Sequence, residues 1–329
     1  MDKDLQTDVW SVVEEGFKLD NQVESESLFA LANGHIGQRG TFAEYYSGDS
    51  RPASRIAGVC YQEPDCKEVK WLNVPNWNGI NVRLNDEVLD LAVWTVENFK
   101  RELNLRDGLL ERSFKATSPK GRQIEVCVKQ FLSMAEKEVG AFNYSVKSLN
   151  FVGRISFTPI IDANITNQDS TDNEQLWNML QVKTQQDVSH LWAHARRMNY
   201  LFCGALTYML YKNNEALRVN PTKIEKERVA GFWVGTDVKA DDTVCLYKYV
   251  AIIDSLSHSN DDLTDYACNL AIDSRKKGWK KLLEENSLAW VDVWAQREDT
   301  IDVYDSNVEA QQKKLYASFR EITRLDCDK

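Results

Sequence analysis

Alternating hydrophobic and polar positions dominate the chain from about residue 50 to 255. The segment RQIEVCVKQF (residues 122–131) has its apolar side chains at every second position, which is typical of a half-buried β-strand. The segment TVCLYKYVAIID (residues 243–254) is apolar on both sides and predicts a strand buried between two layers. Turn residues such as Asn213 and Asn214 separate these runs. Many antiparallel strands at this spacing predict a mostly β fold, a large sandwich of two antiparallel sheets.

The hydrophobic period becomes helical near residue 260. Two helices are expected between residues 260 and 296, separated by Gly278, and the first of them ends in a basic turn. An extended piece at residues 300–304 precedes a third predicted helix, which carries an apolar stripe formed by Leu315, Phe319, Ile322 and Leu325. The sequence shows no obvious partner for this stripe, although a terminal amphipathic helix can also simply dock on the domain.

Composition narrows the range of functions. The formal net charge of -10 argues against nucleic acid as the main partner, because phosphate neutralisation needs clustered Lys and Arg. The opening MDKDLQTDVW is unlike a secretory signal, and no apolar run reaches the length of a membrane span. Seven cysteines without a CxxC pair predict neither a disulfide framework nor a zinc site. We therefore expect reduced, mostly buried thiols in a cytoplasmic protein.

The segment ESLFALANGHIGQRG (residues 26–40) contains a glycine at every third position, Gly34, Gly37 and Gly40, with Arg39 among them. Glycine gives the backbone access to positive φ and to close contacts. The spacing fits neither a Walker loop nor a dinucleotide fingerprint. Two interpretations stay open for Arg39, a buried ion pair inside a tight structural loop or a contact to a carboxylate, phosphate or sugar hydroxyl.

Aromatic and histidine residues give weaker indications. Trp71 and Trp77 in WLNVPNW are candidates for stacking on a sugar ring, although large aromatic side chains also fill the core of a sandwich. His190 and His194 would share one face of a helix, but Leu191 stands where a zinc-protease motif needs Glu, so no metal is predicted. The sequence shows no nucleophile–base grouping and no recognisable acid–base pair of carboxylates.

Several segments, read in order, resemble the amino-terminal domain of glycoside hydrolase family 65, which includes maltose, kojibiose and trehalose phosphorylases. They are ESLFALANGHIGQRGTFAE, WLNVPNWNGINVRLNDEVLDL, LNLRDGLLERSF, KQFLSMAEKEVGAFNYSVKSLNF, IDANITNQ, LYKYVAIIDS and AWVDVWAQREDTIDVYDSNVEAQQ. The resemblance implies a galactose mutarotase-like super-sandwich over residues 1–258 and linker α-helices over residues 259–329. It also implies that these helices lead to a helical-barrel catalytic domain that the chain lacks, because the barrel signature GHxFWDxE is not found in it.

The family reaction is inverting phosphorolysis or hydrolysis of an α-linked glucosyl disaccharide. A glutamic acid of the barrel protonates the glycosidic oxygen while phosphate or water attacks the anomeric carbon. The resemblance thus implies inorganic phosphate as co-substrate for a phosphorylase, no other cofactor, the missing barrel as partner and no catalytic residue in this chain. A homodimer is a further expectation. The residues that match the family's loop signature, and are expected to face the barrel, are Asn33, Gly34, Gly37, Arg39, Gly40 and Glu44.

Two alternatives remain. A self-contained sugar mutarotase or epimerase would need a His and a carboxylate converging in a cleft, with His35, His190, His194 and His258 as the available histidines. A carbohydrate-binding module would instead need exposed aromatic side chains on one concave sheet face. The sequence departs from the family pattern at Gln130 and Leu132, where Arg and Val are usual. The segment KKLYASFREI also matches the family poorly and leaves the start of the barrel undefined.

Overall fold

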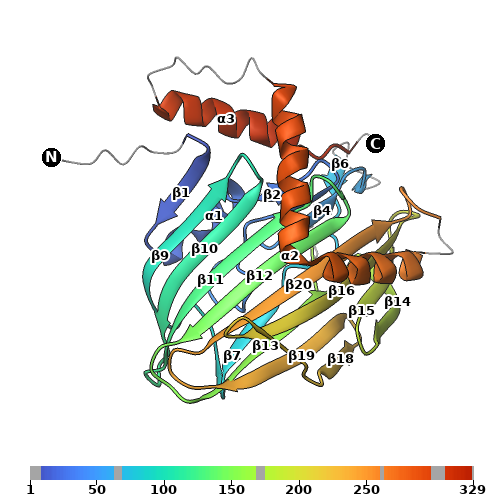
Figure 1. The fold of residues 1–329 in the computed structure, drawn as a ribbon. Coiled ribbons are helices and arrows are strands. Elements are labelled where there is room, and N and C mark those ends of the chain that lie inside the picture. Colours follow the sequence, from blue (N-terminus) through green and yellow to red (C-terminus); the bar gives the residue numbers. More distant parts are fainter. Residues whose placement is uncertain (1–8, 63–68, 168–174, 260–262, 298–307, 328–329) are drawn as a thin grey trace.

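The protein consists of two antiparallel sheets that face each other, with long helices on the outer face of the larger sheet (Figure 1). The structure, a computed structural model, describes residues 9–62, 69–167, 175–259, 263–297 and 308–327. Within these ranges the larger sheet contains, in spatial order, β1 (Ser11–Glu15), β9 (Thr95–Asn104), β10 (Leu109–Thr117), β11 (Gln123–Leu132), β12 (Val139–Ser148), β20 (Thr243–Asp254), β16 (Leu201–Lys212), β15 (Ser189–Ala195) and β14 (Trp177–Thr184), with β17 (Glu215–Leu217) paired to β16.

The smaller layers complete the sandwich. The second sheet has the order β18 (Thr222–Lys226), β19 (Val229–Val238), β13 (Gly153–Asp162), β7 (Ile80–Leu84) and β8 (Glu87–Val88). A three-stranded sheet contains β2 (Leu31–Ala32), β3 (Ile36–Gln38) and β4 (Ser54–Ile56), and β5 (Cys60–Gln62) pairs with β6 (Val69–Trp71). The described helical segments are the 3-10 helix Leu19–Asn21, α1 (Gln22–Leu28), α2 (Leu263–Ala295) and α3 (Val308–Ile322). The predicted mostly β fold with two large antiparallel sheets and trailing helices is confirmed.

β20 shows why one strand is apolar on both sides. Its Leu246 and Val250 point into the core between the sheets, whereas Ala251 and Ile253 pack against the first half of α2 on the outer face. Lys248 is the exception within the core, because its ammonium is fully buried. Its Nζ donates hydrogen bonds to the backbone carbonyls of Trp77 (2.5 Å), Gly79 (3.0 Å) and Ile160 (2.8 Å), and these acceptors offset part of the cost of burying the charge.

α2 changes direction at Gly278, the position that separates the two predicted helices. Gly278 has φ 77° and ψ 164°, a conformation that an L side chain rarely adopts, so the glycine allows the bend. The first half of α2 lies along β16 and β20, and the second half rises toward α3 (Figure 1). The bend therefore brings Trp290 and Trp294 of the second half back to the main core.

The prediction that the stripe on α3 has no partner is wrong. Leu315 and Phe319 are fully buried, and the Phe319 ring stacks on Trp290 with centroids 5.2 Å apart. The hydroxyl of Tyr316 donates to the backbone carbonyl of Leu28 (2.9 Å), which fixes α3 beside α1. The sequence could not reveal this contact because Phe319 and Trp290 meet only when whole helices pack against each other. The predicted extended piece at 300–304 lies outside the described residues.

The prediction of reduced thiols throughout the chain is also wrong. Cys60 of β5 and Cys327 form a disulfide with a Cα–Cα distance of 5.7 Å, within the range usual for such bonds. The two residues are 267 positions apart, so no local spacing indicates the pair. Cys127, Cys203, Cys245 and Cys268 are free and half-buried or buried, and Cys66 lies outside the described residues.

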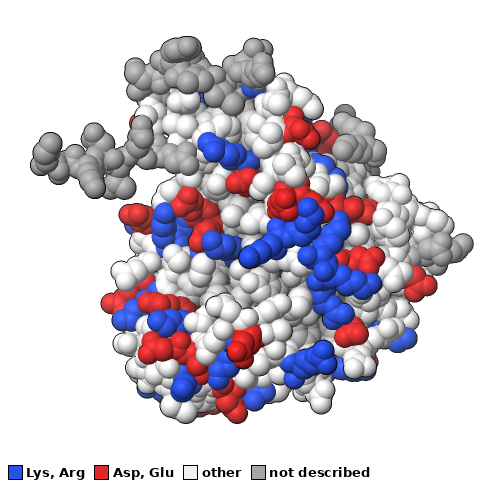
Figure 2. All heavy atoms as spheres, viewed as in Figure 1, with Lys and Arg blue, Asp and Glu red and all other residues white. Residues whose placement is uncertain are grey.

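Charged side chains of both signs alternate over the visible face of the molecule (Figure 2). Basic side chains gather there near the bend of α2, where Lys276, Lys277 and Lys281 pair with Asp273, Glu285 and Glu284. Exposed pairs of this kind contribute little to stability. No helix in the described part of the chain is long and apolar enough to cross a membrane.

Candidate functional site

Asn33 shapes the glycine-rich loop. Its side chain is fully buried, and its Nδ2 donates to the backbone carbonyls of Ser133 (2.7 Å) and Lys137 (2.9 Å). Its Oδ1 accepts the backbone N–H of Ile36 (2.9 Å), which closes the turn between β2 and β3. Gly34, the next residue, has φ +83° at this turn. The asparagine thus ties the loop to the turn between β11 and β12.

The other two loop glycines permit close packing. A Cβ on Gly40 would lie 2.6 Å from the backbone oxygen of Phe29, and one on Gly37 would lie 2.8 Å from Leu325 Cδ1. The same C-terminal segment passes Gly34, whose added Cβ would lie 3.7 Å from the backbone oxygen of Ile322. The end of α3 and the residues after it therefore rest directly on this loop.

Glu44 lies beneath the loop rather than on its surface. Its two carboxylate oxygens accept hydrogen bonds from Arg112 Nη1 (2.6 Å) and Nη2 (2.7 Å), and both side chains are buried. The guanidinium of Arg112 also lies 4.5 Å from the ring centroid of Phe42. This bidentate pair connects the segment after Gly40 to β10 and holds it in place.

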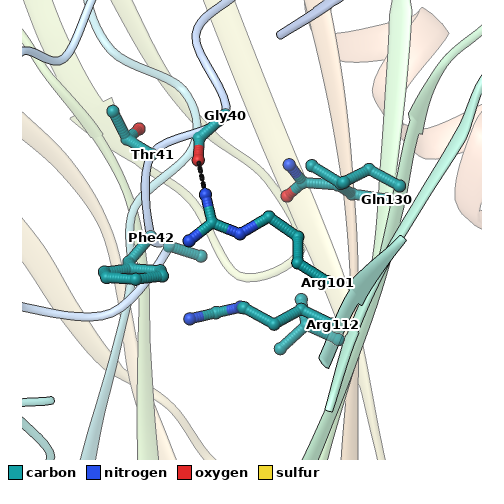
Figure 3. Close-up of a pocket in the computed structure, with 9 residues that line it drawn as sticks. Gly40, Thr41, Phe42, Arg101, Arg112 and Gln130 are labelled. Atoms are coloured by element: carbon teal, nitrogen blue, oxygen red, sulfur yellow. Dashed lines mark hydrogen bonds between the residues drawn. The ribbon is translucent and has the colours of Figure 1, made fainter. Parts of the chain in front are cut away.

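A small cavity separates this segment from β10 and β11 (Figure 3). Arg101 enters it from β9 and donates to the backbone oxygen of Gly40 (3.4 Å), and Gln130 lies on the same side as Arg101, across from Thr41 and Phe42. Burial lowers the pKa of Arg101 to about 10. The cavity measures about 10 Å³, which is room for one water molecule and not for a sugar. The cavity therefore belongs to the packing beneath the loop and is not a sugar-binding site.

A larger pocket lies on the other side of the loop, between β3, β4, β6 and the end of α3. Its volume is about 310 Å³, and we call it the arginine pocket. The described residues that line it are Ser27, Ala30, Leu31, Ala32, Gly37, Gln38, Arg39, Ala53, Arg55, Trp71, Arg320, Thr323, Arg324 and Leu325. Three of the candidate site residues from the sequence, Gly37, Arg39 and Trp71, thus meet here.

Arg39 has features of both interpretations left open by the sequence. Its Nη2 lies 3.6 Å from a carboxylate oxygen of the buried Glu26, and it donates to the backbone carbonyl of Val23 (2.7 Å). Its Nε is buried without a hydrogen-bond partner among the described residues. The ion pair therefore anchors the side chain while one face of the residue lines the pocket.

The two candidate tryptophans have different environments. Trp71 is half-buried, lines the arginine pocket and carries the guanidinium of Arg55 over its ring at 5.4 Å. Trp77 is fully buried in the main core, which leaves no ring face for a sugar. Sequence reasoning missed Arg55, Arg320 and Arg324. Arg320 and Arg324 are four positions apart, but α3 ends at Ile322, so no local pattern pointed to either of them or to Arg55.

The histidines mostly support structure. His35 lies 3.4 Å from Asp254, whose Oδ1 accepts the backbone N–H of Leu256 (2.8 Å) at the end of β20. His258 Nε2 lies 2.5 Å from Glu138 Oε1, and burial raises the pKa of that carboxyl. Neither pair lines the arginine pocket.

His190 and His194 lie on the strand β15 and not on a helix. His190 is buried against Gln181 and Cys268. Among the residues that the structure describes, no group of three or more His, Cys, Asp or Glu side chains is placed to hold a metal ion.

Comparison with known proteins identifies the family. The sequence model of "Glycosyl hydrolase family 65, N-terminal domain" matches residues 12–293. Maltose phosphorylase of Bacillus subtilis (strain 168) is 28% identical over 303 residues, which cover 88% of this chain and 39% of that protein. Alpha,alpha-trehalose phosphorylase of Thermoanaerobacter brockii is 30% identical over 187 residues, 53% of this chain and 24% of that protein.

The fold has a counterpart among solved structures. A provisionally named kojibiose phosphorylase from the human microbiome superimposes with a TM-score of 0.83 at 22% identity, over 97% of this chain and 42% of that chain. The chain therefore spans about two fifths of the length of the maltose phosphorylase and of this structural relative. The match of one family model to residues 12–293, together with the shared super-sandwich, shows that the chain belongs to glycosyl hydrolase family 65 through that family's N-terminal domain.

Proposed function

We propose that this chain is the N-terminal, non-catalytic part of an enzyme that cleaves α-linked glucosyl disaccharides with inversion. The attacking group would be inorganic phosphate in a phosphorylase or water in a hydrolase. The observation that carries the proposal is the family match over residues 12–293. The names of two relatives, a maltose phosphorylase and an alpha,alpha-trehalose phosphorylase, support phosphorolysis over hydrolysis.

We further propose a division of labour along the chain. Residues 1–258 form the super-sandwich, and residues 259–329 form the helical linker that leads to a barrel carrying the general acid. The loop signature Asn33, Gly34, Gly37, Arg39, Gly40 and Glu44 would then support the face toward that barrel. The packing of the C-terminal segment on Gly34 and Gly37 supports this orientation, because it brings the chain to the loop at its last described residues. We also propose a homodimeric enzyme of the cytoplasm, in which the Cys60–Cys327 disulfide is the exception among the otherwise free thiols of the described residues.

Two experiments test the proposal. The chain alone, incubated with maltose, kojibiose or trehalose and with phosphate, is expected to release neither glucose nor glucose 1-phosphate above the blank. Robust turnover would refute the assignment of catalysis to another domain.

The gene downstream of codon 329 tests whether the chain comes from a longer enzyme of this family. An open frame that encodes a helical barrel supports it, and the encoded full-length protein should cleave one of the three disaccharides. A stop codon directly after Lys329 contradicts it.

A further inference from the structure

The outer face of the smaller sheet carries a pocket of its own, which we call the sheet pocket. Its volume is about 350 Å³. The helices α2 and α3 lie against strands of the larger sheet, on the other side of the molecule (Figure 1). The described residues that line the sheet pocket are Tyr45, Asn81, Arg83, Val88, Thr158 and Trp233.

Strand pairing places three of these side chains in one row. Asn81 of β7 lies opposite Thr158 of β13. The pairing of Phe157 with Val234 makes Trp233 of β19 the neighbour of Thr158 on its other side. Phe157 and Val234 themselves are buried in the core, because successive side chains of a strand point to opposite faces of the sheet. An amide, a hydroxyl and an indole therefore stand side by side on the outer face.

Trp233 has glycine at both same-face positions of its own strand. Gly231 and Gly235 are two residues away on either side, so β19 places no side chain against the indole from these positions. The guanidinium of Arg154 lies over the ring at 5.2 Å, and it is itself held by Asp237 at 3.4 Å and by the backbone oxygen of Gly235 at 2.9 Å. The indole is thus half-buried, supported by a fixed guanidinium, and lines the pocket.

Tyr45 reaches the sheet pocket from the segment that follows the glycine-rich loop. Its neighbour Glu44 is held inside by Arg112, whereas the side chain of Tyr45 is 52% exposed. The backbone N–H of Ile80 donates to the carbonyl of Ala43 (2.7 Å), which fixes this segment beside the start of β7. The pocket therefore contains a second aromatic ring, supplied by a segment that is firmly held.

The polar side chains of the sheet pocket are not used by other parts of the described chain. Those of Tyr45, Asn81, Arg83 and Thr158 make no hydrogen bond and no ion pair among the described residues. The described lining also contains no Asp or Glu. It presents an amide, two hydroxyls and one guanidinium, which together donate to and accept from neutral hydroxyl groups.

We propose that the sheet pocket binds one pyranose ring of a neutral saccharide. A pyranose has an apolar face of C–H groups and a rim of hydroxyls, and the pocket places aromatic rings beside amide, hydroxyl and guanidinium groups in the same way. Its volume lies near the lower limit of small-molecule sites, which suits a short saccharide. Arg83 is the single charge of the described lining, so a neutral ligand fits the pocket better than an anion.

The choice of a glucosyl saccharide as the ligand rests on the proposed function, whereas the site itself rests on its lining. The sheet pocket lies on the smaller sheet and is separate from the general acid that we assign to the barrel. Binding is measured on the chain alone and needs no catalysis. The site can therefore be refuted while the full-length protein cleaves a disaccharide, and it can be supported if that protein cleaves none.

Isothermal titration calorimetry of the 329-residue chain tests the site, with maltose and cellobiose as titrants up to about 20 mM. We expect heat from maltose and an affinity that stays the same as sodium chloride is raised, because salt does not screen a neutral ligand. Binding of maltose alone would show a preference for the α linkage, whereas equal affinities would show recognition of a single ring. Either result supports the proposal.

Matched variants place the site. Trp233→Ala should weaken maltose binding by about tenfold and Tyr45→Ala by about threefold or more, because each removes an aromatic contact to the sugar. Trp71→Ala is the control, a half-buried tryptophan that lines the arginine pocket, and it should leave the affinity unchanged. Circular dichroism of each variant verifies folding. Tyr45→Ala serves if Trp233→Ala fails to fold, because Tyr45 is largely exposed.

Three results would overturn the proposal. The first is no heat from either disaccharide up to about 20 mM. The second is an unchanged affinity for maltose in both Trp233→Ala and Tyr45→Ala. The third is loss of binding in a folded Trp71→Ala variant while Trp233→Ala binds normally, which would place the saccharide in the arginine pocket instead.

Discussion

The buried pair of Glu44 and Arg112 gives the sharpest test of how the loop is held. Glu44→Gln keeps the shape of the side chain but removes the negative charge that faces a buried guanidinium at 2.6 and 2.7 Å. Removing one partner of a buried pair costs about 3–5 kcal/mol, because the remaining charge stays away from water without compensation. Both side chains are less than a tenth exposed, so solvent screening reduces this value little.

The free energy of unfolding, measured by urea denaturation at pH 7, checks the magnitude. Glu97→Gln is the matched control, because Glu97 lies 3.8 Å from Lys115 in an exposed pair and should lose less than about 1 kcal/mol. A loss below about 1 kcal/mol for Glu44→Gln would refute the reasoning. It would mean that water reaches Arg112 or that the loop rearranges to pair it again.

Three further predictions concern other contacts. Phe319→Ala should lower stability by about 3–5 kcal/mol and expose α3 to limited proteolysis, since it removes the stack on Trp290; unchanged proteolysis would contradict the docking of α3. Gly40→Ala should cost about 1–3 kcal/mol in urea denaturation, because its Cβ would overlap the Phe29 backbone, and a neutral effect would show that the loop gives way. Burial lowers the pKa of His190 below the ordinary value of 6.5. Between these two pKa values the unfolded chain is protonated at this residue and the folded chain is not. Stability should therefore be full above about pH 6.5 and fall as the pH drops toward the folded pKa. In the variant His190→Gln the free energy of unfolding should fall less than in the unchanged chain as the pH drops from 6.5 to the folded pKa. An equal fall in both proteins would contradict the prediction.

The fold could be predicted further than the site. Strand alternation and the change of period near residue 260 required no knowledge of tertiary contacts, because each side chain's preference for core or water is a local property. The bend at Gly278 was also readable, since only glycine adopts that conformation readily. The arginine pocket was not readable. Its lining comes from residues 27–71 and 320–325, and only folding brings Arg55 and Arg320 to the same cavity.

The sequence by itself determined the sandwich, the order of strands and helices and the family, because period, turn residues and collinear motifs are all local. Only the tertiary structure decided which partners single side chains within those elements contact. Lys248 sits in a strand that the sequence predicts as buried, yet nothing in that strand shows that its ammonium meets three carbonyls from distant segments. Cys60 and Cys327 likewise met across 267 positions. Pairings between remote residues depend on how whole elements pack, and no local pattern carries that information.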